Sequence, residues 1–151
     1  MKDIAKQLIT IGFDINKCFK DRKTVLMHAC VKGMKDVVEL IFLQNVDINA
    51  RDVNGKTALM YVSNGHKEYR YTIDIVNKLL SVDADVNIID TLNKTALIYA
   101  CDMESDIVAK ILLDAKADYN VLFICKFNYN IFDMNIFNMN IFDMKQKFKK
   151  I

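Results

Sequence analysis

Proline and tryptophan are absent from this chain of 151 residues, which also has only four glycines and two histidines. Without proline, no turn and no helix start can rely on a ring that fixes the backbone angle φ. No apolar run approaches the ~20 residues of a transmembrane helix, and no signal peptide is recognisable after Met1, so we expect neither. The net charge is only +2, which does not favour nucleic acid or an anionic membrane as a partner.

The sequence also lacks the motifs of common catalytic and metal sites. It has no glycine-rich phosphate loop, no HExxH and no nucleophile elbow. Its four cysteines show neither CxxC nor zinc spacing; they are Cys18, Cys30, Cys101 and Cys125. His28 and Cys30 are two residues apart, which on a helix directs them to different faces. We therefore predict no enzyme, no catalytic residue, no cofactor and no metal. Cys30 and Cys101 are interpreted as small buried apolar residues in a reducing compartment, the cytoplasm of the producing cell or of a host cell.

What the chain does contain is an internal repeat. A Thr-x-Leu motif begins at Thr24, Thr57 and Thr95, in steps of 33 and 38 residues. Each copy precedes an apolar helical run and an Asp-Φ-Asn triplet, in which Φ is apolar or aromatic. The triplets keep the same steps and then step by 33 again; they are residues 14–16, 47–49, 85–87 and 118–120. Two independent markers in one register indicate a true repeat.

These motifs resemble the ankyrin repeat over about residues 3–121. The resemblance implies an all-α solenoid in which each unit is a β-turn followed by two short antiparallel helices. The predicted array covers residues 1–122, with a half repeat at 3–18 and full repeats at about 19–51, 52–89 and 90–122. A low-complexity apolar and basic tail follows at 123–151.

The chain departs from the family pattern in three ways. Methionine or isoleucine stands at Met27, Met60 and Ile98, where the family has the histidine of Thr-Pro-Leu-His. The second full repeat carries five extra residues, which we place between its two helices, from about His66 to Tyr71. Asn45 replaces the glycine that ends the second helix of the first full repeat, and the corresponding residue of the last repeat is Lys116. We expect both in the left-handed conformation that this position requires.

The resemblance implies a concave partner-binding surface made of turn tips and first helices. The matching positions are Lys20, Asp21, Lys23, Val31, Lys32, Arg51, Val53, Asn54, Lys56, Asn64, Thr91, Leu92, Lys94, Asp102 and Met103. Lys23, Lys56 and Lys94 share one position and predict a basic row with steps of roughly 10 Å. The row either binds an acidic partner or only aids solubility.

The five-residue insertion offers a second candidate contact. Tyr69, Arg70 and Tyr71 are residue types that are enriched at interfaces. They either bind a partner or pack the longer loop onto its neighbours.

We therefore expect a non-catalytic protein–protein interaction module that binds an acidic partner protein. Neither nucleic acid nor a membrane is predicted as a partner, and the chain is expected to be monomeric unless its C-terminal face self-associates. The alternative is a fragment or degenerate copy of a longer ankyrin array with a structural role only.

The C-terminal segment generates a proteolysis prediction. Residues 121–127 are apolar enough to cover the last repeat, whereas the five-residue period of 130–144 gives no consistent apolar face. Trypsin should therefore cut quickly at Lys145, Lys147 and Lys149 and slowly at Lys126. Rapid cleavage at Lys126 in the folded protein would contradict this cap and leave an apolar end exposed.

Overall fold

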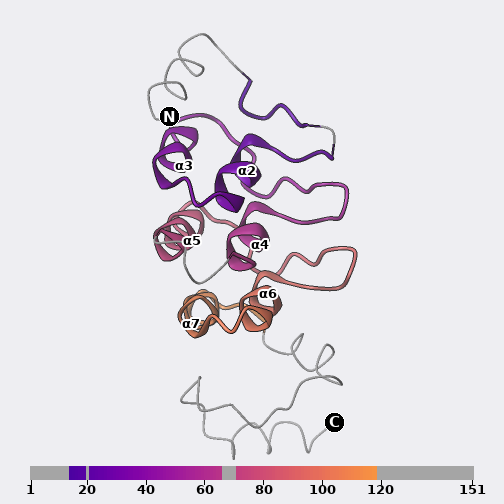
Figure 1. Ribbon diagram of the computed structural model, residues 1–151, viewed down its shortest axis with the longest axis vertical. Helices are drawn as coiled ribbons and strands as arrows, with labels where there is room; N and C mark the ends of the chain where they lie inside the picture. Colours follow the sequence, from indigo (N-terminus) through magenta and orange to yellow (C-terminus); the bar gives the residue numbers. More distant parts are fainter. Residues whose placement is uncertain (1–13, 20, 66–70, 119–151) are drawn as a thin grey trace, which may run out of the picture.

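The computed structural model describes residues 14–19, 21–65 and 71–118, and this part of the chain is built of helices and turns without strands. The helices pair within each repeat as predicted. They are α2 (Val25–Val31), α3 (Lys35–Ile41), α4 (Ala58–Ser63), α5 (Thr72–Leu80), α6 (Ala96–Asp102) and α7 (Asp106–Asp114). Figure 1 shows two layers, with α2, α4 and α6 stacked beside α3, α5 and α7. The turns project from the layer of α2, α4 and α6, on the side away from the other layer.

Each first helix begins where the Thr-x-Leu motif predicts. The hydroxyls of Thr24, Thr57 and Thr95 each accept a hydrogen bond from the backbone N–H three residues later, at 3.3–3.4 Å. These bonds satisfy N–H groups that have no partner within the helix. In the first full repeat the sulfur of Met27 also accepts from the N–H of Thr24 at 3.4 Å. A methionine thus supplies part of a reciprocal cap there.

The leucine of each motif lies in the core at an equivalent place. Leu26, Leu59 and Leu97 are exposed by no more than 1%. On the second helices, the buried positions include Val38, Val76 and Ala109, which are also in register. The three leucines therefore occupy equivalent buried positions, as predicted.

The inserted residues lie between α4 and α5. The connection between the two helices comprises residues 32–34 in the first full repeat, 103–105 in the third and 64–71 in the second. The second connection is therefore five residues longer, as predicted, although residues 66–70 within it lie outside the described part.

The turns need a left-handed residue two positions before each threonine. Arg22, Gly55 and Asn93 have φ of 57°, 75° and 57°. Only the middle turn has the glycine that tolerates this conformation without strain. A Cβ on Gly55 would also lie 2.8 Å from a guanidinium nitrogen of Arg51 and 3.3 Å from Cα of Asp90. The neighbouring turn therefore approaches Gly55 closely.

The prediction for Asn45 is wrong, whereas that for Lys116 is confirmed. Lys116 is left-handed with φ of 65°, but Asn45 is not among the described residues of positive φ. The carbonyl oxygen of Asn45 instead accepts a hydrogen bond at 2.8 Å from the side chain of Asn16, in the preceding triplet. This contact places the segment after α3 without a left-handed residue.

The Asp-Φ-Asn triplets join successive repeats. The side-chain oxygens of Asn16, Asn49 and Asn87 accept hydrogen bonds of 2.7–3.0 Å from the backbone N–H of the aspartate in the next triplet. The next triplets begin at Asp47, Asp85 and Asp118. The repeated asparagine is therefore a link between neighbouring units.

Two predictions fall on residues outside the described part. Residues 3–13 of the half repeat and the tail from 121 onward, including the apolar segment at 121–127, are not described. The half repeat and the C-terminal cap therefore stay predictions.

The shared leucine position generates a stability prediction. Replacing Leu26, Leu59 or Leu97 by alanine should each lower the free energy of unfolding by about 2–5 kcal/mol, because a cavity replaces packed methyl groups. Leu43, which is 76% exposed, is the matched control, and its alanine variant should stay within about 0.5 kcal/mol of the parent. Urea unfolding of the four variants measures the difference. A Leu97→Ala protein as stable as the control would refute the register.

Candidate binding surface

The second turn is closed by a buried carboxylate. One oxygen of Asp52, which is only 3% exposed, accepts from the N–H groups of Asn54 and Lys56 at 2.9 and 2.8 Å. Its other oxygen accepts from the hydroxyl of Tyr61 on α4 at 2.6 Å. The carboxylate therefore ties the turn to the helix that follows it.

The same arrangement recurs in the third turn. Asp90 accepts from the N–H groups of Leu92 and Lys94 at 2.8 and 2.9 Å and from the hydroxyl of Tyr99 at 2.5 Å. The aspartate and the tyrosine are nine residues apart in both repeats. Sequence reasoning missed this pair, although the recurring spacing would have indicated it.

In the first full repeat both partners are replaced together. Phe19 and His28 stand at the positions of the aspartate and the tyrosine, and their rings meet edge to face at 5.1 Å between centroids. An aromatic contact thus replaces the hydrogen bond. His28 is exposed whereas Cys30 is buried, so the two point to different faces as predicted.

Burial and hydrogen bonding hold the two tyrosines in the neutral form. Loss of hydration raises the pKa of Tyr61 and of Tyr99, and the hydrogen bonds to Asp52 and Asp90 raise it further. The phenols therefore act as hydrogen-bond donors well above the pH at which a free tyrosine ionises.

The predicted basic row is interleaved with these tyrosine rings. The ammonium groups of Lys23 and Lys56 lie 5.2 and 5.8 Å from the centroid of Tyr61. Those of Lys56 and Lys94 lie 4.5 and 5.4 Å from the centroid of Tyr99. We call these five residues the Lys–Tyr ladder. It runs across all three full repeats, and each contact within it is of the attractive cation–π kind.

The ladder is not uniform in charge. Lys94 forms an ion pair of 2.7 Å with Asp102, the last residue of α6. The other two full repeats have Val31 and Asn64 at the position of Asp102, and neither residue carries a charge. Among the described residues, neither Lys23 nor Lys56 forms an ion pair. Positive charge is therefore most available at the first two lysines.

A broad depression lies beside Lys23, at one end of the Lys–Tyr ladder. It has a volume of about 460 Å3, and its lining is partly apolar and partly charged. The lining residues are Phe19, Asp21, Lys23, Val25 and His28. The depression adds an apolar contact area to the basic row, because the side chain of Phe19 is 52% exposed.

The other predicted contact residues are only partly gathered around the ladder. Val53 and Leu92 are exposed at the turn tips, by 53% and 65%. Lys32, Asn64 and Met103 each follow the last residue of a first helix. Lys20, Tyr69 and Arg70 lie outside the described residues.

Two predicted contact residues take part in links between turns. The guanidinium of Arg51 donates at 3.2 Å to the carbonyl oxygen of Gly55 and at 2.7 Å to that of Ile89. The carbonyl oxygen of Asn54 accepts from the N–H of Thr91 at 2.9 Å. Both residues remain exposed.

Tyr71 belongs to the other layer of helices and not to the ladder. Its ring lies 5.6 Å from the ammonium group of Lys35 on α3. The contact favours the interpretation that this residue packs the longer connection onto its neighbour.

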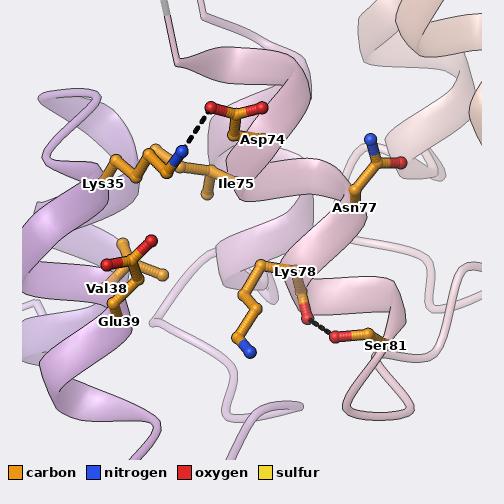
Figure 2. A pocket seen from close by; sticks show the side chains of 8 residues that line it. All are labelled: Lys35, Val38, Glu39, Asp74, Ile75, Asn77, Lys78 and Ser81. Carbon is orange, nitrogen blue, oxygen red and sulfur yellow. Dashed lines mark hydrogen bonds and ion pairs between the residues drawn. The ribbon is translucent and has the colours of Figure 1, made fainter.

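A groove of about 320 Å3 lies between α3 and α5 (Figure 2). Lys35 and Asp74 form an ion pair of 2.6 Å across the groove, and Glu39 and Lys78 add two further charged groups to its lining. Ser81 at its edge donates its hydroxyl to the carbonyl oxygen of Lys78 at 2.7 Å. This surface pair contributes little to stability, because both charges remain in contact with water. The groove brings no histidine or cysteine to its carboxylates.

The described residues form no cluster of three or more metal-ligating side chains. Nor does this part of the chain contain a helix of the length and apolarity that crossing a membrane requires. Burial raises the pKa of the Cys30 thiol to about 12, so its reactive thiolate is not formed at neutral pH. Cys30 fills space in the core, as predicted.

Comparison with known proteins identifies relatives of the repeat. A family model described as ankyrin repeats, in three copies, matches residues 1–90. Protein HOS4 of Saccharomyces cerevisiae is 36% identical over 64 residues, which is 42% of this chain and 6% of that protein. The chain therefore corresponds to a small part of that relative. Helices α6 and α7 lie beyond the matched residues but repeat the same arrangement.

The tyrosine–aspartate pairs generate a prediction about alkaline pH. Above about pH 10 the unfolded chain releases the protons of Tyr61 and Tyr99, whereas the folded state keeps them. The free energy of unfolding should therefore fall as the pH rises above this value. The double variant Tyr61→Phe/Tyr99→Phe should be less stable at neutral pH, by about 1–3 kcal/mol per site, because each buried carboxylate loses a donor. It should also lose less stability between pH 9 and 11 than the parent does.

Urea unfolding at a series of pH values measures both effects. Tyr71→Phe is the matched control, since Tyr71 is 39% exposed and lies outside the ladder. An alkaline slope that is the same in the parent, the control and the double variant would contradict the assignment.

Proposed function

Because this chain belongs to the ankyrin repeat family, whose members generally bind other proteins, we propose that it recognises an acidic partner protein through the Lys–Tyr ladder. The family is typically non-catalytic, and the proposed role requires no reaction at the surface. Recognition through this face combines the three lysines with the exposed turn tips beside them. The proposal rests on one observation, the interleaving of lysines and tyrosines across three successive repeats.

The ladder supports recognition because its parts are already held in place. The rings of Tyr61 and Tyr99 are fixed at the hydroxyl end by buried carboxylates. Lysines that rest on fixed rings lose less side-chain entropy when a partner binds than freely moving lysines do. Aromatic residues beside basic groups also supply apolar contact area at a binding surface.

Charge complementarity favours an acidic partner over a neutral one. Lys23 and Lys56 make no ion pair with a described residue. A carboxylate of the partner would therefore not have to displace a carboxylate of this part of the chain. Exposed ion pairs contribute modestly to affinity, but they raise the rate of association and fix the register of the complex.

A matched pair of charge-reversal variants tests the proposal. The ladder variant carries Lys23→Glu, Lys56→Glu and Lys94→Glu, and the control carries Lys17→Glu, Lys78→Glu and Lys110→Glu. All three control lysines are exposed and lie outside the ladder, so both variants change the net charge equally. Proteins captured from the producing cell by the parent should be retained by the control and lost by the ladder variant. Capture by the parent should also weaken as salt is raised.

Melting curves of both variants establish that they are folded. Capture of the same proteins by the parent, the control and the ladder variant would contradict the proposal.

A further inference from the structure

We infer that copies of this chain associate head to tail, with the third turn of one copy docking in the depression beside the first turn of the next. Such association goes beyond the proposed function and does not rest on it. Figure 1 shows the turns in one row, so the first and third turns lie at opposite ends of it. We call the depression, with Phe19 and Val25 in its lining, the head end. The third turn, with Ile89 and Leu92, is the tail end.

Inside the stack each turn packs on the turn before it. The N–H of Val53 donates to the carbonyl oxygen of Asp21 at 3.1 Å, and the N–H of Thr91 donates to that of Asn54 at 2.9 Å. Both hydrogen bonds join residues at the same two positions of successive repeats. The same contact between turns is therefore used twice within one chain.

The head end is the corresponding surface without a preceding turn. Phe19 stands at the position of Asp52, and Val25 stands at that of Ala58. In the second repeat, Asp52 and Ala58 are only 3% and 1% exposed. In the first repeat, Phe19 is 52% exposed and Val25 is half-buried. The depression therefore lies where a preceding turn covers the other repeats.

The tail end presents the groups that such a contact uses. The carbonyl oxygen of Leu92 stands at the position of the Asp21 and Asn54 carbonyls, and it accepts no hydrogen bond from a described residue. The side chains of Leu92 and Ile89 are 65% and 46% exposed. The third turn can therefore offer a following turn the contact that the first two turns offer.

Both ends differ from the interior of the stack by being more apolar. Phe19 replaces the aspartate of the other two repeats, and Leu92 replaces Asn54 of the second turn. Ile89 stands where the second repeat has Arg51. The end repeats of a solenoid normally present a polar outer face, which keeps the array soluble. Apolar residues at both ends favour contact between the ends over exposure of either end to water.

A contact between unlike ends does not close on itself. Joining a head end to a tail end leaves one free end of each kind, so association continues in one direction. A contact between two like ends would instead stop at the dimer. Since the contact covers little more than a turn and the start of α2, we expect weak association, visible at about 0.1–1 mM protein.

Two end variants and their mixture test this arrangement in the full chain. Phe19→Glu places a charge on the head end, and Leu92→Glu places one on the tail end. Val53→Glu is the matched control, because Val53 is 53% exposed on the middle turn. In sedimentation velocity the parent and the control should form species that grow beyond the dimer with concentration, whereas each end variant alone should associate at least about tenfold more weakly. Each variant keeps the end that the other has lost, so their equimolar mixture should form a heterodimer and nothing larger.

A second head variant keeps the test valid if Phe19→Glu does not fold. Val25 is the first residue of α2, where a negative charge is favourable, and Val25→Glu leaves the contact between Phe19 and His28 in place. It should weaken association as Phe19→Glu does and form the same heterodimer with Leu92→Glu. Melting curves establish which variants are folded.

The response to salt separates this contact from the proposed recognition of an acidic partner. Association through apolar ends should persist as salt is raised, whereas capture of an acidic partner should weaken. A parent that stays monomeric at about 1 mM would overturn the inference. A mixture that associates no more strongly than either variant alone, or a parent that stops at the dimer, would overturn it in favour of contact between like ends. These results leave the proposed function untouched, because the ladder variants test that function separately.

Discussion

The second and third turns, and the Lys–Tyr ladder beside them, depend on the buried carboxylates of Asp52 and Asp90. An ionised carboxylate in such a place is costly unless hydrogen bonds replace its hydration. Each one accepts from two backbone N–H groups of its own turn and from one tyrosine hydroxyl. Closing the turn and orienting the tyrosine are therefore parts of one interaction, and neither is independent of the other.

Successive repeats are joined by polar contacts at two edges of the stack. At the turn edge, the N–H of Val53 donates to the carbonyl oxygen of Asp21 at 3.1 Å, and the N–H of Thr91 donates to that of Asn54 at 2.9 Å. At the other edge, the triplet asparagines accept from the backbone of the next triplet. Apolar helix packing fills the space between these edges. Because hydrogen bonds are directional and apolar packing is not, the edges fix the register while the core supplies most of the stabilisation.

Tyr61 and Tyr99 connect this framework to the proposed recognition of a partner. Their hydroxyls take part in the structural contacts, while their rings carry lysines from two successive turns. The electrostatic character of the ring face attracts the ammonium groups without neutralising them. The charge therefore remains available to a partner, except at Lys94, where Asp102 already occupies it.

The sequence by itself determined the repeat, the threonine caps, the buried leucines and the place of the insertion, because these depend on local periodicity and on spacing along the chain. It also predicted the shared position of Lys23, Lys56 and Lys94. The tertiary structure decided how those lysines alternate with Tyr61 and Tyr99, since Lys23 and Tyr61 are 38 residues apart and meet only when repeats stack. It likewise gave Asn45 a conformation that the family pattern did not predict, through a contact from the preceding triplet. Spacing within one repeat follows from the geometry of a helix, whereas contacts between repeats depend on the distance and rotation at which the units pack, and no local pattern encodes these.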